Sequence, residues 1–113
     1  MKTIGLLGGM SWESSIEYYR IINETVRERL GGLHSAKSLM YSVNFAEIEI
    51  LQHAADWEAL TQAMIDAAKQ IEKSGADVLV ICTNTMHRMA PEVSGAINIS
   101  LLHIPDAAAE AIK

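Results

Sequence analysis

The chain has 113 residues, 50% of them hydrophobic, and this length and composition predict one globular domain with a sizeable core. Its formal net charge is −5 and its 9 lysines and arginines are scattered, which argues against a nucleic-acid partner because phosphate binding needs clustered cations. No apolar run approaches membrane-spanning length, and nothing at the N-terminus resembles a signal peptide. A single cysteine fits a reducing compartment, so we expect a cytoplasmic protein with small-molecule partners and no membrane contact.

The N-terminal part of the chain predicts a strand, a glycine turn and a helix. Residues 3–7 form a short apolar run that ends at a pair of glycines. Ser14, with Glu17 three residues later, is a capping-box pattern that marks the expected start of the helix, and the glycines at residues 31–32 would end it. Apolar residues at spacings of three and four predict one helix face, made of Ile16, Tyr19, Ile22, Val26 and Leu30.

The rest of the chain continues to alternate strands and helices. Residues 38–43 predict a second strand, and Asp56 is a plausible N-cap for a helix that Gly75 would end. The apolar face of that helix consists of Leu60, Met64, Ala67, Ala68 and Ile71. The remaining expected elements are a buried strand at residues 77–81, a short helix at residues 86–93 whose Pro91 fits only in a first turn, a strand at residues 97–104 and a helix beginning at Asp106. This order predicts an α/β fold in three α-β-α layers with a four-stranded parallel sheet.

The glycine-rich turn over residues 5–13 is the first candidate site. Glycines let the backbone approach a ligand, and the N-terminus of the following helix offers free N–H groups to a carboxylate or a phosphate. The turn lacks the G-x-G-x-x-G spacing and a P-loop lysine, so it does not favour a nucleotide. The alternative is a tight turn in which glycine serves only the backbone geometry.

The second candidate is the lone thiol of Cys82, which follows the expected buried strand. Thr83, Asn84 and Thr85 come directly after it, and three hydrogen-bonding side chains in a row are costly to bury without a purpose. A helix expected to follow would stabilise the thiolate and lower the pKa of Cys82 below its free value. The alternative is a buried structural cysteine. Cys82 and His87 lack zinc-ligand spacing, so no metal is expected. Two further histidines, His34 and His53, lie in loop-like stretches, and His103 would reach the same edge of the sheet.

Two motifs together resemble the aspartate/glutamate racemase family, especially its broad amino-acid racemase branch. The first is Gly-Gly-Met-Ser-Trp-Glu-Ser at residues 8–14, and the second is Cys-Thr-Asn-Thr-Met-His at residues 82–87. The stretches at residues 31–36 and 42–49 also resemble that family, so the similarity covers essentially the whole chain. The resemblance implies a fold of two similar α/β domains with the active site between them, one cysteine from each domain, and no pyridoxal phosphate or metal.

This chain, residues 1–113, resembles only the N-terminal domain of that family, and the C-terminal domain would be absent. The resemblance makes Cys82 one of two acid/base residues that move the Cα proton of an amino acid. It further implies that Thr83, Asn84 and Thr85 hold the substrate's α-carboxylate, and that Met10, Ser11 and Gln52 line the pocket. With one of the two cysteines, the chain is expected to be an inactive or partial fragment of a cofactor-independent racemase. The apolar surface left by a missing domain predicts a homodimer.

One departure from the family pattern bears on the substrate. Some aspartate-specific members carry an arginine after the second strand, whereas this chain has Ala-Glu-Ile-Glu at residues 46–49, which disfavours an acidic substrate. Other classes of function stay open. The chain could be a module that binds an amino acid or small carboxylate without turnover. A thiol-dependent oxidoreductase lacks the C-x-x-C pair, and a hydrolase lacks the G-x-S-x-G turn.

Overall fold

A computed structural model of the protein describes residues 1–82 and 89–102 and shows one four-stranded sheet. Its strands are β1 (Thr3–Gly8), β2 (Lys37–Ser42), β3 (Val78–Ile81) and β4 (Ser100–Leu102). They run in the order β2-β1-β3-β4, and all three neighbouring pairs are parallel. The predicted α/β fold with a four-stranded parallel sheet is therefore confirmed.

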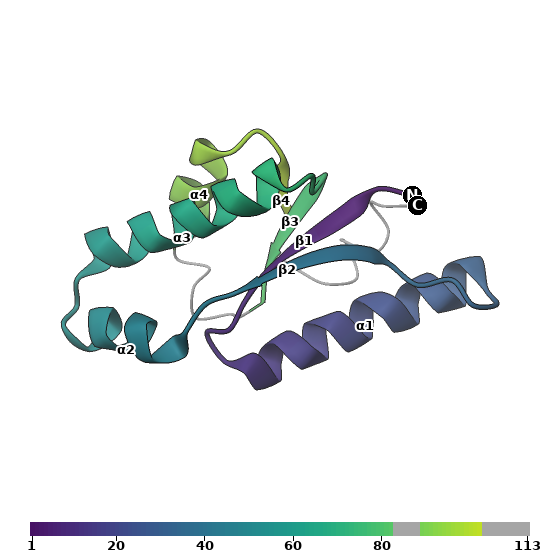
Figure 1. Ribbon diagram of the computed structural model, residues 1–113, viewed down its shortest axis with the longest axis horizontal. Coiled ribbons are helices and arrows are strands. Elements are labelled where there is room, and N and C mark those ends of the chain that lie inside the picture. Colours follow the sequence, from purple (N-terminus) through teal and green to yellow (C-terminus); the bar gives the residue numbers. More distant parts are fainter. Residues whose placement is uncertain (83–88, 103–113) are drawn as a thin grey trace.

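The helices lie on both faces of this sheet, as Figure 1 shows. They are α1 (Trp12–Leu30), α2 (Phe45–His53), α3 (Trp57–Lys73) and α4 (Ala90–Ala96). Helix α2 was not predicted from the sequence, and the prediction that His53 lies in a loop is wrong, since His53 is the last residue of that helix. The side chain of Asn44 caps α2 by accepting a hydrogen bond from the Ala46 N–H at 3.1 Å.

Helix α3 follows its sequence pattern closely. Every residue of its predicted apolar face is buried, and the Asp56 carboxylate accepts a hydrogen bond from the Ala59 N–H at 3.1 Å, as expected of an N-cap. The helix lies so close to β1 that a Cβ on Gly5 would collide with the Ile71 side chain. This face holds the larger hydrophobic cluster, which also includes Leu79 and Ile81 of β3.

Helix α1 only partly follows its predicted pattern. Ile22 and Val26 are buried, but Ile16, Tyr19 and Leu30 are 54%, 49% and 41% exposed. For Ile16 and Tyr19 the physical reason is that β2 is an edge strand: both lie beside Met40 of β2, and among the described residues no further strand lies beyond it. The start of α1 was also misplaced, since its N-cap is Ser11 and not Ser14.

The C-terminal elements are shifted from their predicted positions. Helix α4 has Pro91 in its first turn and continues to Ala96, and β4 begins at Ser100 and not at residue 97; residues 86–88 and 103–104 of the two predictions lie outside the described residues. The predicted helix from Asp106 and the predicted position of His103 fall outside the described residues. In the part of the chain that is described, no helix is both long enough and apolar enough to cross a lipid bilayer.

Candidate active site at the carboxyl edge of the sheet

The carboxyl ends of three strands are joined by backbone hydrogen bonds. The Cys82 N–H, directly after β3, donates to the Leu7 carbonyl of β1 at 2.9 Å. On the other side of β1, the Val43 N–H, directly after β2, donates to the Gly8 carbonyl at 2.9 Å. The residues that follow β1, β2 and β3 therefore lie at one edge of the sheet, where parallel α/β folds place their ligands.

Cys82 lies in the hydrophobic interior on the α1 side of the sheet. Its side chain is 1% exposed, and it belongs to a cluster with Ile4, Leu6, Ile22, Val26, Val78 and Val80. Burial raises the pKa of the Cys82 thiol to about 12, so the prediction of a lowered pKa is wrong. The next described helix starts at Ala90, eight residues after Cys82, and the predicted start of a helix at residue 86 lies outside the described residues. Thr83, Asn84 and Thr85, together with His87, lie outside the described residues.

Tyr18 of α1 packs against the cluster that contains Cys82. Its phenol is half-buried, and its pKa is raised first by this burial and second by the negative charge that a Cys82 thiolate would carry. The two groups are thus close enough to interact electrostatically. The inward side of α1 consequently covers Cys82 with one aromatic ring and two aliphatic side chains, Ile22 and Val26.

The turn between β1 and α1 is held from the helix side. Gly9 has a φ of 92°, in the left-handed region that favours glycine, and its N–H donates to the Ser15 hydroxyl at 3.0 Å. The Ser11 hydroxyl accepts from the Ser14 N–H at 3.4 Å. Ser15 was not among the predicted site residues, although its position directly after the glycine-rich motif and one residue before the predicted helix face is a signal that could have identified it.

The other two predicted pocket residues lie on the α3 side. Met10 is buried in the larger hydrophobic cluster, which also contains Ile48 of α2. Gln52 is one helical turn after Ile48, so it shares the inward face of α2, and it is half-buried. Met10, from the turn between β1 and α1, and Gln52 of α2 thus lie on the α3 side, whereas Cys82 packs on the opposite face of the sheet with α1.

Acidic side chains border the hollow next to β2. Glu47 of α2 and Asp66 of α3 line a hollow of about 510 Å³ together with Ser42 and Asn44. Glu49 points elsewhere, into a second hollow of about 510 Å³ that His53 also lines. The two glutamates therefore diverge: Glu47 lies with Ser42 and Asn44 near the end of β2, and Glu49 does not line that hollow. Within residues 1–82 and 89–102, no three His, Cys, Asp or Glu side chains are grouped so that they would hold a metal ion.

These features define an α/β domain with a site at the carboxyl edge of a parallel sheet and one thiol beside it. The family model of Asp/Glu/hydantoin racemases matches residues 7–113. The chain therefore belongs to the Asp/Glu/hydantoin racemase family.

Solved structures and a curated relative agree with this assignment. A protein from Yersinia pestis, described as a candidate Asp/Glu racemase, is 54% identical with a TM-score of 0.89, over 99% of this chain and 49% of that one. An aspartate racemase homologue from Pyrococcus horikoshii OT3 is 35% identical with a TM-score of 0.83, again over 99% of this chain and 49% of that one. The broad specificity amino-acid racemase RacX of Bacillus subtilis is 35% identical over 49 residues, which are 43% of this chain and 22% of RacX. The chain thus spans about half the length of the solved relatives.

Proposed function

We propose that this chain is the N-terminal domain of a cofactor-independent amino-acid racemase in which Cys82 moves the Cα proton. The observation that carries the proposal is the position of Cys82: it follows β3 and is hydrogen-bonded through its backbone to Leu7, next to the glycine-rich turn, in a member of the racemase family. By the family resemblance, Met10, Ser11, Gln52 and Thr83, Asn84 and Thr85 bind the substrate.

The reaction removes the Cα proton and builds up negative charge beside the α-carboxylate. The site must therefore supply a base, fixed hydrogen-bond donors where the charge collects, and an acid on the opposite face of Cα. With a pKa of about 12, the Cys82 thiol is protonated at neutral pH, which is the state required of the acid. The ammonium group of a bound amino acid would favour the thiolate, because an opposite charge nearby stabilises the ionised form.

A single cysteine serves only one face of the substrate. The chain has one cysteine, and it spans 49% of the length of its solved relatives, so we propose that the second acid comes from outside these 113 residues. The isolated chain is then inactive in racemisation. The free thiol of Cys82 is consistent with a cytoplasmic protein.

Deuterium exchange at Cα tests the mechanism. The chain is incubated in D₂O with L-alanine, L-aspartate and L-lysine, and Cα deuteration is followed by NMR together with optical rotation. We expect no racemisation, and any slow exchange with retained configuration should disappear in Cys82→Ser. Full racemisation that depends on Cys82 would contradict the inactive-fragment proposal, whereas exchange unaffected by Cys82→Ser would contradict the role of the thiol.

For the substrate, the proposal is a neutral or cationic amino acid and not an acidic one. Glu47 and Asp66 both border the hollow after β2, and a substrate carboxylate near them would be repelled. Neutralising this charge tests the effect: Glu47→Gln should strengthen the binding of L-aspartate relative to L-alanine. Glu49→Gln is the matched control, because Glu49 lines the other hollow. Equal effects of the two variants on the binding of L-aspartate would show that Glu47 does not act on the substrate more than Glu49 does.

The alternative is a module that binds an amino acid or small carboxylate without turnover. The deep burial and raised pKa of Cys82 favour it, since a protonated interior thiol need not react. Under this alternative, Cys82→Ala leaves the affinity for an amino acid unchanged and the wild type shows no Cα exchange. Isothermal titration of the wild type and the variant, combined with the exchange assay, separates the two functions.

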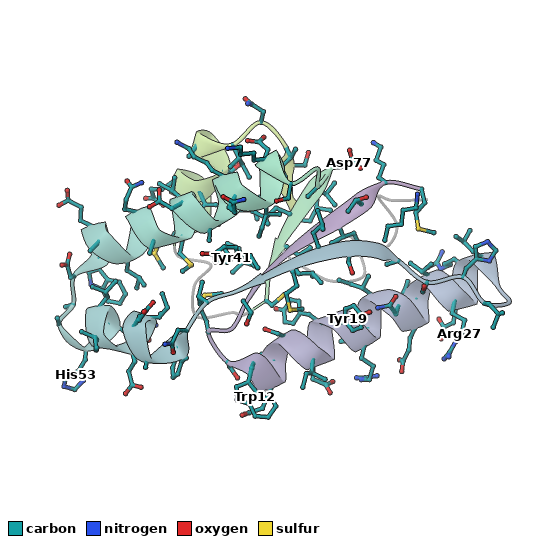
Figure 2. The ribbon with its side chains drawn as sticks, viewed as in Figure 1. Trp12, Tyr19, Arg27, Tyr41, His53 and Asp77 are labelled. Atoms are coloured by element: carbon teal, nitrogen blue, oxygen red, sulfur yellow. The ribbon has the colours of Figure 1, made fainter. Side chains whose placement is uncertain are left out.

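For the assembly, the proposal is a homodimer. Trp12, Ile16 and Tyr19 of α1 and Met40 of β2 border an apolar groove of about 400 Å³, and all four are 44% to 63% exposed. Figure 2 shows Trp12 at the start of α1 and Tyr19 directed toward β2. The groove runs beside the edge of β2 that no other described strand pairs with, and a second copy related by a two-fold axis can cover both at once.

Light scattering over a concentration series tests this assembly. Tyr19→Glu should shift the chain to a monomer, and Tyr41→Glu, at a similarly exposed residue on the α3 side of β2, is the control. A wild-type chain that stays monomeric at every concentration would contradict the homodimer and leave this groove to another segment of a longer chain.

A further inference from the structure

Ser15 is the one buried polar side chain among residues 1–82 and 89–102, with 4% exposure. It occupies the inward face of α1, in line with Ile22 and Val26, where an aliphatic residue would add to the core. A hydroxyl in this place loses its contacts with water and stays only if protein groups replace them. No buried side-chain nitrogen or oxygen of the described residues lacks a partner, Ser15 included.

The partners of Ser15 lie on both sides of Met10. Its Oγ accepts a hydrogen bond from the Gly9 N–H at 3.0 Å and donates to the Ser11 carbonyl at 3.4 Å. The Ser15 N–H also donates to the Ser11 carbonyl, at 3.2 Å. One side chain thus ties the residues before and after Met10 to the first turns of α1.

The same turn is confined from the β2 side. A Cβ on Gly9 would lie 2.6 Å from the Ser42 hydroxyl and would collide with Val43, whose N–H donates to the Gly8 carbonyl at 2.9 Å. On the helix side, a Cβ on Gly8 would lie 2.5 Å from the Ser15 Oγ. The turn therefore has Ser15 against one side and Val43 against the other, and it can move only if one of these contacts is lost.

We propose that Ser15 is a positioning residue, which holds Met10 and Ser11 in place at the strand end next to Cys82; this rests on the proposed function of those residues. A hydroxyl suits the task because it accepts and donates at once. Without it, the Gly9 N–H is buried and unpaired, and the turn must move toward water to satisfy it. That movement carries Met10 and Ser11 away from the strand ends, where the Cys82 N–H is hydrogen-bonded to the Leu7 carbonyl.

Amide hydrogen exchange measured by NMR on the whole chain tests the hydrogen bond. In Ser15→Ala, exchange at the Gly9 amide should become about tenfold or more faster, while the Leu79 amide in the centre of the sheet stays unchanged. Ser15→Thr keeps the hydroxyl and should restore slow exchange. Ser14→Ala is the matched control, since it removes a neighbouring hydroxyl that makes none of the hydrogen bonds described above. If Ser15→Ala fails to fold, Ser15→Cys, which weakens the same hydrogen bonds, takes its place.

A titration with L-alanine on the same samples tests the link to the site. The wild type should show shifts at Ser11, Ser15→Ala should lose at least half of its affinity, and Ser15→Thr should recover it. If the wild type and Ser15→Ala bind L-alanine with the same affinity, or if Gly9 exchange is unchanged in the variant, the positioning role of Ser15 is overturned and the proposed function is not. A wild type that responds to no amino acid would instead overturn the proposed function, and with it the role of Ser15 in the site.

Discussion

The two faces of the sheet differ in how completely they are covered. The α3 face holds the larger hydrophobic cluster, to which α2 and α4 also contribute, and every predicted apolar residue of α3 is buried there. The α1 face has one described helix, a smaller cluster and several exposed apolar side chains. Cys82 lies on this second face. The difference shows that an apolar helix pattern predicts burial only where strands lie beneath the whole pattern, and here the sheet ends at β2.

Truncation of one residue on each helix should give the largest contrast. Met64 of α3 is fully buried, so Met64→Ala should lower the free energy of unfolding by about 2–5 kcal/mol through lost contacts and a cavity. Ile16→Ala, at an exposed position of α1, should cost about 0.5 kcal/mol or less. Urea unfolding at low protein concentration measures both. Equal losses that grow with concentration would show that Ile16 is buried in an assembly.

Alkaline pH should reveal the burial of Cys82. The thiol ionises near pH 8.5 in the unfolded chain and near 12 in the folded chain, so its contribution to stability is complete below about pH 8 and is lost as the pH rises toward 12. The stability of the wild type relative to Cys82→Ala should fall by about 2 kcal/mol between pH 7 and pH 10. A constant difference over this range would mean that the thiol is hydrated in the folded state.

The elements with strong local signals were predictable from the sequence. Asp56 and the spacing of apolar residues after it defined α3, and the run at residues 77–81 placed Cys82 after a buried strand. Helix α2 was missed because Ile48 and Ile50 alternate with glutamates, as in a strand, although Asn44 with Glu47 three residues later is an N-cap pattern. Over the described residues, the predicted order of strands and helices was thus correct, with one helix omitted.

The state of the thiol was not predictable in the same way. Its position after β3 is a local property, but its pKa depends on Ile22 and Val26, which reach it from a helix far away in the sequence. A local rule about helix N-termini predicted a lower pKa, and tertiary burial raised it. Ser15 was overlooked for a related reason: its hydrogen bonds to Gly9 and Ser11 depend on how α1 lies against the turn.

The N-caps of the two long helices offer a smaller test of the same comparison. Asp56→Ala should lower the free energy of unfolding by about 1 kcal/mol, because the carboxylate accepts from Ala59 at 3.1 Å. Ser11→Ala should cost less, about 0.5 kcal/mol, since its bond to the Ser14 N–H is longer, at 3.4 Å. Thermal unfolding of the two variants measures the difference. A larger loss in Ser14→Ala than in Ser11→Ala would support the N-cap that the sequence indicated.

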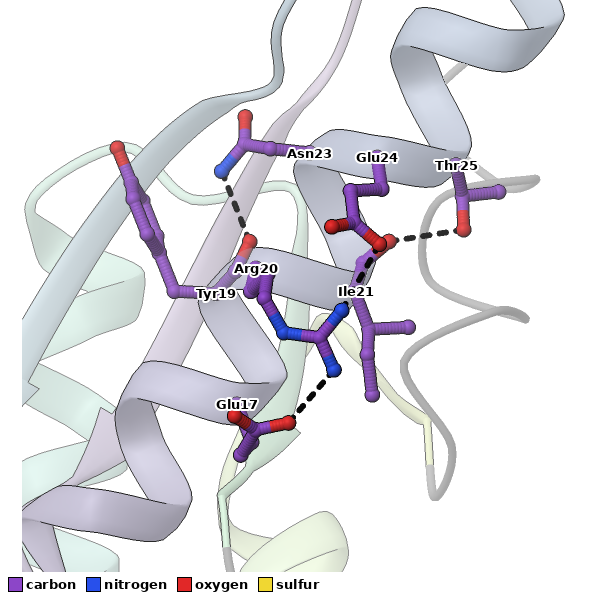
Figure 3. A network of polar contacts seen from close by, with 7 residues as sticks. All are labelled: Glu17, Tyr19, Arg20, Ile21, Asn23, Glu24 and Thr25. Carbon is purple, nitrogen blue, oxygen red and sulfur yellow. Dashed lines mark hydrogen bonds and ion pairs between the residues drawn. The ribbon is translucent and has the colours of Figure 1, made fainter.

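The charged outer face of α1 should contribute least. Arg20 contacts Glu17 at 2.6 Å and Glu24 at 2.9 Å, as Figure 3 shows, and all three side chains are about half exposed. Arg20 lowers the pKa of Glu17, so the attraction is present at neutral pH and is lost as the pH falls through the range in which Glu17 is protonated. Arg20→Gln should therefore destabilise the chain less than any variant above, and the loss should vanish both in 1 M salt and at acidic pH. A loss that persists under both conditions would mean that the aliphatic part of Arg20 covers the exposed apolar residues of α1, and the α1 face would then be better covered than its side-chain exposure indicates.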